Sequence, residues 1–224
     1  MVHVYATDIT NLPDPLEEPQ LMEGLLKDRK KKIMRCKQRE ARKPSLGAGL
    51  LLQHVLDSHG VSAQAIKFGA NGKPEAEGIY FNLSHSRNMV VCAASDKPVG
   101  CDIEKMAEAP YKVAERFFGE NEIKYLAQFS DEEKNKEFYR LWTMKESYIK
   151  MTGEGMQLPF NQFEIRLEER AKVLRDEKIQ NCFIKEYEKP GYRLTVCAEE
   201  EEFSGQIQYI YIDNLLLFGV KFKK

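Results

Sequence analysis

Two runs of short strand-like segments, each preceded by helical segments, constrain the fold of this chain more than any other feature. The strongest single prediction is a helix over residues 131–151, because apolar side chains recur there near the 3.6-residue period of an α-helix. Gly153 and Gly155 are expected to end this helix. The apolar stripe comprises Phe138, Leu141, Trp142, Tyr148 and Ile149.

The remaining elements follow from composition and turn residues. Further helices are expected at residues 17–31, 46–58, 113–118 and 120–129. Strands are expected at residues 2–5, 79–83, 89–94, 99–103, 163–167, 182–187, 192–198, 206–212 and 215–222. Helices followed by strands in each half predict an α+β protein with two lobes and a possible internal duplication. The character of the sequence changes around residues 109 and 110, where we expect the lobes to meet.

Composition limits the classes of function. The 224-residue chain has a net charge of −1, so it is no generic binder of polyanions and an anion site requires local clustering. No apolar run reaches the ~18–20 residues that span a bilayer, and no secretory leader is visible. The five cysteines lack C-x-x-C spacing and are expected to be free thiols. We therefore expect a cytoplasmic protein that binds neither membranes nor nucleic acid.

Two acids in a predicted strand form the first candidate site. Side chains alternate between the faces of a strand, so Asp102 and Glu104 share one face. Neighbouring carboxylates repel each other and are stable together when a cation lies between them. Oxygen ligands suit a hard ion such as Mg²⁺. The alternative is a pair of surface acids at the end of a strand.

The long helix carries the second candidate site. Trp142, Glu146 and Lys150 are spaced by four residues and share one face of the helix. Glu146 could supply a third carboxylate, and Lys150 could contact a phosphate. The alternative is a salt bridge between Glu146 and Lys150 beside a core tryptophan.

Two polar segments could bind anions. Ser84 and His85, at the end of a predicted strand, could hold a phosphate or could form an ordinary turn. A Ser-His hydrolase is disfavoured because adjacent side chains rarely face each other and no G-x-S-x-G elbow is present. The basic stretch at residues 27–43 could be a solvated helix face, a nucleic-acid patch or a clamp for a compact polyanion.

The order of these segments resembles the 4'-phosphopantetheinyl transferases, and in particular their surfactin-synthetase-activating branch. The strings that carry the resemblance are F-N-L-S-H-S, V-G-C-D-I-E, R-F-F and L-W-T-M-K-E-S-Y-I-K, supported by Gly72-Lys73-Pro74 and Gly153-Glu154-Gly155. The resemblance spans about residues 35–198. It implies two similar α+β lobes, at residues 1–106 and 107–224, that form a monomeric pseudo-dimer with the active site between them.

The resemblance also implies a reaction. A Mg²⁺-dependent enzyme (Mn²⁺ being possible) would move the phosphopantetheine arm of coenzyme A to a serine of an acyl or peptidyl carrier protein and release adenosine 3',5'-bisphosphate. Asp102, Glu104 and Glu146 match the metal ligands, and Glu146 also matches the general base. Lys150 matches a lysine on the phosphates, with Lys145 as an assistant.

The resemblance assigns the residues that contact coenzyme A less firmly. Ser84 and His85 match residues that hold the coenzyme A phosphates, with His85 counted among the catalytic residues, and Lys73 matches a lysine near the nucleotide. Three further cations fall where the family binds the 3'-phosphate and adenine, namely Lys31, Arg35 and Lys43. Pro44 replaces the Thr or Ser of many relatives, and Glu122 matches a recurring acid without a firm role.

Two other functions are compatible with the same residues. The three acids could serve a Mg²⁺-dependent nuclease or phosphatase, which would hydrolyse phosphoesters without a carrier protein. A non-catalytic module that binds coenzyme A or a carrier protein is the other alternative. Such a binder has no need of three acids and Lys150, which favours the transferase.

Overall fold

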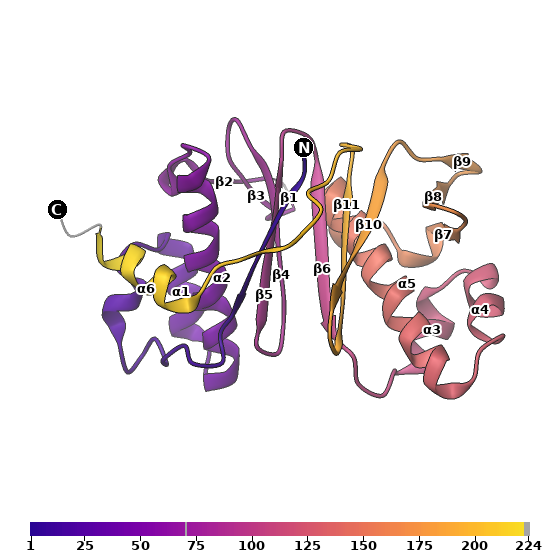
Figure 1. Ribbon diagram of the computed structural model, residues 1–224, viewed down its shortest axis with the longest axis horizontal. Helices are drawn as coiled ribbons and strands as arrows, with labels where there is room; N and C mark the ends of the chain where they lie inside the picture. Colours follow the sequence, from indigo (N-terminus) through magenta and orange to yellow (C-terminus); the bar gives the residue numbers. More distant parts are fainter. Residues whose placement is uncertain (70, 222–224) are drawn as a thin grey trace.

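The computed structural model describes residues 1–69 and 71–221 and stacks four layers, helix on sheet on sheet on helix (Figure 1). The first helical layer holds α1 (Lys27–Arg35), α2 (Arg39–Ser58) and α6 (Ile212–Lys221). The helical layer at the other end is built on α5 (Asp131–Thr152). This architecture confirms the α+β class, with a long helix backing each of the two main sheets.

Each main sheet is small. The first has the order β12 (Gln208–Tyr209), β1 (His3–Asp8), β5 (Met89–Ser95) and β4 (Tyr80–Ser86). The second has the order β10 (Phe183–Lys189), β11 (Tyr192–Ala198) and β6 (Val99–Lys105). All neighbours are antiparallel except β1 and β12. β4 and β6 therefore lie at the edges of their sheets.

Strand alternation explains why the two sheets pack face to face. Val91 of β5 joins a buried cluster with Cys101 and Ile103 of β6, and this cluster fills the space between the sheets. The intervening residues of β5, such as Val90 and Cys92, face α2 and join a second cluster. Because β5 is buried on both faces, its sequence is an almost continuous apolar run.

The second half of the chain builds its own core against α5. Two short helices, α3 (Tyr111–Phe117) and α4 (Glu120–Leu126), precede α5. Trp142 stacks on Phe138 and Phe160, with centroid separations of 6.0 and 5.1 Å, which places this tryptophan in an aromatic cluster.

Short elements complete the chain. In the described residues, 3-10 helices lie at Pro19–Met22, Ala63–Ala65, Gly155–Gln157 and Phe160–Gln162. A small hairpin pairs β2 (Lys67–Phe68) with β3 (Pro74–Glu75), and a third sheet contains β7 (Phe163–Leu167), β8 (Ala171–Arg175) and β9 (Lys178–Ile179). No helix in residues 1–69 and 71–221 combines the length and apolar character that a membrane span requires.

Two predictions about secondary structure are wrong. The segment 215–222 was expected to be a strand, but its described part belongs to α6, which packs on α2 with Leu215 buried. A short apolar run does not distinguish a buried strand from a buried helix. The predicted helix 17–31 is instead a 3-10 helix at Pro19–Met22 followed by α1, with Gly24 in the break.

The two main sheets do not follow the two halves of the sequence. β6 belongs to the second sheet, whereas β12 and α6 return to the first, so the sheets exchange segments around the expected boundary. The division into lobes at residues 1–106 and 107–224 stays a prediction.

Gly100 allows α5 to lie directly on β6. A Cβ atom at this position would stand 2.1 Å from the carbonyl oxygen of Ser147 and 2.3 Å from the amide nitrogen of Met151. Both atoms belong to the backbone, so the clash cannot be relieved by rotating a side chain. The glycine thereby sets the distance between the strand that bears Asp102 and the helix that bears Glu146.

Gly100→Ala is expected to lower the free energy of unfolding by at least about 1–3 kcal/mol, because the methyl group would push α5 away from β6. Gly205→Ala is the matched control, since a Cβ there meets nothing within 4 Å. Urea unfolding followed by circular dichroism compares the two variants. Equal unfolding midpoints for both would contradict this explanation of the close approach.

Candidate active site

The candidate site lies where β6 meets α5. Because Cys101 and Ile103 face the other sheet, Asp102 and Glu104 project toward α5, as strand alternation predicted. Lys150 of α5 completes the contact, with its Nζ 2.5 Å from Asp102 Oδ1. The salt bridge that involves Lys150 therefore runs to Asp102, and Asp102 is only 3% exposed.

The charge of Asp102 acts on both Glu104 and Glu146. Burial raises the pKa of Glu146, Lys150 lowers it, and the charges of Asp102 and Glu104 raise it further. Burial also raises the pKa of Glu104, and the charge of Asp102 adds to that effect. Burial alone would lower the pKa of Lys150, but Asp102 and Glu146 raise it above its ordinary value. The carboxylates thus carry excess negative charge that Lys150 offsets only in part.

The residues present fit a hard divalent cation in their chemistry. The Oδ2 atom of Asp102 is buried and accepts no hydrogen bond from the described residues. An unpaired buried carboxylate oxygen is costly, and a cation would satisfy it. No group of three His, Cys, Asp or Glu side chains within the described chain is already arranged around a metal position. The cation that contacts Asp102 here is the ammonium group of Lys150.

Two serines of β4 reach the same acids. Ser84 Oγ donates to Asp102 Oδ1 at 2.8 Å and accepts from Lys150 Nζ at 3.2 Å. Ser86 Oγ donates to Glu104 Oε2 at 2.8 Å. Ser84, which the sequence suggested as a phosphate contact, therefore also orients an acid of the cluster.

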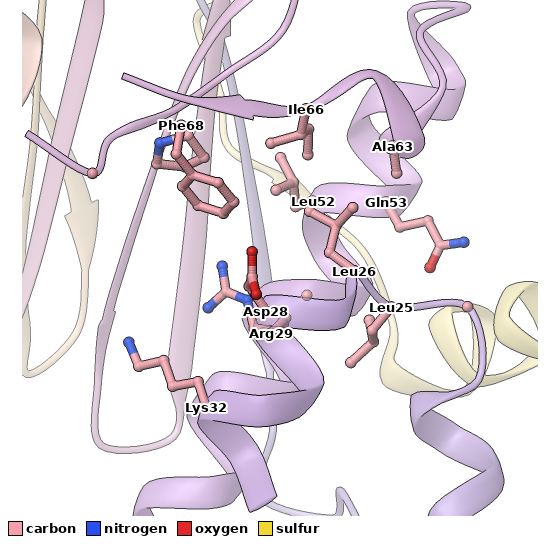
Figure 2. Close-up of a pocket in the computed structure, with 14 residues that line it drawn as sticks. Leu25, Leu26, Asp28, Arg29, Lys32, Leu52, Gln53, Ala63, Ile66 and Phe68 are labelled. Atoms are coloured by element: carbon pink, nitrogen blue, oxygen red, sulfur yellow. The ribbon is translucent and has the colours of Figure 1, made fainter. Parts of the chain in front are cut away.

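A pocket of about 340 Å³ opens between α1, α2 and the β2–β3 hairpin (Figure 2). Its walls are largely apolar and include Leu52, Ile66 and Phe68. Arg29 and Lys32 of α1 add positive charge to the lining, and burial lowers the pKa of Arg29. Asp28 is the third charged residue of the lining, which therefore holds two cations and one acid. Apolar walls with a few polar groups are typical of a small-molecule site.

The basic stretch contributes different cations from those that the sequence singled out. Of the described residues, those lining this pocket include Arg29 and Lys32 but not Lys31, Arg35 or Lys43. Lys31 is exposed and pairs with Asp28 at 3.3 Å, Arg35 is exposed, and Lys43 is half-buried on α2. Lys31 lies about 100° around the helix from Lys32, so the helical phase, with Ile33 buried, turns Lys31 away from the pocket. Arg35 is the last residue of α1, one turn beyond Lys32, which is the last α1 residue in the lining.

His85 connects the pocket to the acids electrostatically. It lies on β4 between the two serines in sequence, and its side chain points away from theirs. Partial desolvation lowers the pKa of His85, and the positive charges of Lys32, Lys150 and Arg29 lower it further. A neutral imidazole surrounded by cations is suited to an anionic ligand.

Lys73 holds the end of α5. Its Nζ donates to the carbonyl oxygen of Lys150 at 2.6 Å and to that of Met151 at 3.3 Å. Asn71 in the same hairpin donates to the carbonyl oxygen of Gly153 at 2.9 Å. A cation at the C-terminus of a helix stabilises the helix dipole, so the hairpin fixes the turn that carries Lys150.

Lys145 does not reach the acid cluster, and the expectation that it assists at the phosphates is wrong. It is fully buried, with Nζ 2.9 Å from both Glu122 oxygens and 2.6 Å from the carbonyl oxygen of Phe163. Glu122 also accepts from the amide of Gly119, which caps α4, and from that of Ile165. Sequence reasoning found Glu122 but not its role, which is to join α4, α5 and β7.

The arrangement can hold a charged phosphate group and accept a proton. Lys150 provides positive charge, and His85 provides hydrogen bonding. Glu146, whose pKa is raised, is suited to a general base near neutral pH. Arg29 and Lys32, whose charges lower the pKa of His85, also line the pocket between α1, α2 and the β2–β3 hairpin.

Comparison with known proteins identifies the family. Residues 98–197 match the 4'-phosphopantetheinyl transferase superfamily. The chain is 37% identical to the 4'-phosphopantetheinyl transferase ffp of Bacillus subtilis over 209 residues, which cover 89% of this chain and 93% of that protein. It is 35% identical to Sfp of Bacillus subtilis (strain 168), over 73% of this chain and 75% of that protein.

A third relative agrees with these two. The 4'-phosphopantetheinyl transferase gsp of Aneurinibacillus migulanus is 38% identical over 71% of this chain and 70% of its own length. The chain belongs to the 4'-phosphopantetheinyl transferase superfamily, in its Sfp-type branch.

Proposed function

We propose that this enzyme transfers the 4'-phosphopantetheine arm of coenzyme A to a serine of an apo carrier protein in a reaction that requires Mg²⁺, with Mn²⁺ as a possible substitute. Adenosine 3',5'-bisphosphate is the other product. The observation that carries the metal dependence is the unpaired, buried Oδ2 of Asp102 in a cluster with Glu104 and Glu146. The same cluster carries the two family motifs, D-x-E and W-x-x-K-E.

Asp102, Glu104 and Glu146 are the proposed metal ligands. When bound, Mg²⁺ would supply positive charge to the pyrophosphate of coenzyme A and stabilise the charge that develops on the leaving group. Its binding would also offset the effects that raise the pKa of Glu104 and Glu146, which are burial first and then the charge of Asp102.

Lys150 and Glu146 have separate roles in the proposed chemistry. The ammonium of Lys150 binds a phosphate oxygen and orients the phosphate that is attacked. Glu146 accepts the proton of the carrier serine hydroxyl, directly or through water, as the serine oxygen bonds to the β-phosphorus and the bond to the leaving group breaks. His85 and Ser84 contribute hydrogen bonds to the phosphates.

The pocket in Figure 2 is the proposed site for the nucleotide end of coenzyme A. Its apolar walls suit adenine, and Arg29 and Lys32 suit the phosphates. Lys31, Arg35 and Lys43 remain proposed contacts at the margin of this site. Lys73 supports the site through the end of α5, besides the nucleotide contact that the family resemblance implies.

The expected partners are coenzyme A and an acyl or peptidyl carrier protein. We propose that the enzyme acts as a monomer, because the chain itself provides both halves of the site. We also propose that it acts in the cytoplasm. Carrier proteins of this class are usually acidic, which suits a cluster of cations around His85 electrostatically. A nucleic-acid substrate is not expected.

Glu146→Gln is expected to lower the rate of transfer by roughly a hundredfold or more, because the amide cannot accept the serine proton. Coenzyme A binding should largely persist. Conversion of apo to holo acyl carrier protein measures the transfer, and titration calorimetry measures the binding. Glu132→Gln, on an exposed turn of the same helix, is the control and should leave both unchanged. A normal transfer rate for Glu146→Gln would show that Glu146 is not the base.

A further inference from the structure

Polar side chains of β4 replace a strand ladder at the seam between the two main sheets. β4 ends one sheet and β6 ends the other, and the two edges carry no ladder of backbone hydrogen bonds between them in the described structure. Three side chains of β4 instead point toward β6, at alternate positions on one face of the strand: Asn82, Ser84 and Ser86.

Each of these side chains accepts one backbone N–H of β6. Cys101 donates to Asn82 Oδ1 at 3.0 Å, Ile103 to Ser84 Oγ at 3.3 Å, and Lys105 to Ser86 Oγ at 3.0 Å. The unpaired edge of β6 is thereby satisfied by side chains instead of a neighbouring strand. The donating residues of β6 alternate with the acids: Asp102 and Glu104 lie between them in sequence.

Ser86 makes a second contact that orients its hydroxyl. A serine hydroxyl has one proton and two lone pairs. Because Lys105 N donates to Ser86 Oγ, a lone pair is occupied, and the proton points to Glu104 Oε2 at 2.8 Å. The amide of Lys105 therefore fixes the Ser86 hydroxyl, and the hydroxyl in turn fixes the carboxylate of Glu104, the residue before Lys105.

We propose that Ser86 is a positioning residue for Glu104, which it holds in one orientation for a divalent cation. The proposal rests on the proposed function of Glu104 as a metal ligand. By binding Oε2, Ser86 leaves Oε1 as the oxygen offered to the cation. Partners that orient a ligand in this way typically change metal affinity by about 10–100-fold when they are removed.

The test uses Mn²⁺ as the probe, in the presence of coenzyme A. Electron paramagnetic resonance measures Mn²⁺ affinity for the parent enzyme, Ser86→Ala and Ser86→Thr. We expect Ser86→Ala to weaken the affinity by about 10–100-fold and Ser86→Thr, which keeps the hydroxyl, to restore it to near the parent value. The Mg²⁺ concentration that gives half-maximal transfer should shift in the same direction.

Asn82→Ala is the matched control. It removes the rung to Cys101 but touches no acid, so it should lower the melting temperature while leaving the Mn²⁺ affinity unchanged. Parent-like affinity in Ser86→Ala, or equal weakening in Ser86→Ala and Asn82→Ala, would overturn the role of Ser86. An absence of Mn²⁺ binding by the parent enzyme would instead overturn the proposed metal site, and the positioning role with it.

Discussion

Lys145→Met should lower the free energy of unfolding by about 3–5 kcal/mol, because it leaves the Glu122 carboxylate buried without its counter-charge. Glu122 keeps its bonds from the amides of Gly119 and Ile165, but these do not neutralise it. The methionine conserves most of the lysine stem, so the loss reports mainly on the charge. Urea unfolding followed by far-ultraviolet circular dichroism measures the effect.

Two further variants define the origin of that loss. Lys136→Met removes an exposed partner of Glu132 on the same helix and should have no measurable effect. Combining Lys145→Met with Glu122→Gln should recover part of the lost stability, since the buried charge is gone. If Lys145→Met and Lys136→Met unfold at the same urea concentration, the buried pair does not stabilise the second half as described.

Asp102→Asn should lower the rate of transfer by a factor of about 10³ or more, since the loss of a carboxylate from the proposed cation site removes several kcal/mol of charge stabilisation. Asn also fails to neutralise Lys150, whose Nζ lies 2.5 Å from Asp102 Oδ1. Conversion of an apo acyl carrier protein at saturating coenzyme A measures the rate.

Asp96→Asn is the matched control for this experiment, because Asp96 is exposed and lies in the loop after β5. It should transfer at the parent rate. A thermal melt of Asp102→Asn shows whether the fold persists. A folded Asp102→Asn variant with activity within a few-fold of the parent would remove Asp102 from the active site.

The sequence correctly predicted the local placement of the acids. The period of two along β6 correctly put Asp102 and Glu104 on one face, and the periodic stripe correctly located α5. These patterns depend only on backbone geometry, which residue spacing reveals. The seam between β4 and β6 is different, because it joins edges of two sheets and follows from tertiary packing alone.

The cations show a similar limit. The composition of a basic run does not show which of its cations line a pocket. Arg35 lies one turn beyond Lys32 along α1, and the helical phase separates Lys31 from Lys32. That phase is set by the packing of Ile33. Lys73 shows the same limit for contacts between distant parts of the sequence, because it binds the carbonyl oxygen of Lys150, which lies 77 residues further along the chain.

The C-terminal segment was misread because propensity and packing disagree there. Its apolar residues satisfied the strand pattern, but contact with α2 favours a helix in which Leu215 is buried. Neither strand propensity nor the apolar run could predict that this segment packs on α2.

The measurement that tests the central claim most directly is the intact mass of an apo carrier protein after incubation with this enzyme, coenzyme A and Mg²⁺. We predict an increase equal to one phosphopantetheine arm, which EDTA abolishes and added Mg²⁺ restores. An unchanged mass across both acyl and peptidyl carrier proteins, with the enzyme folded and coenzyme A bound, would contradict the proposed transfer.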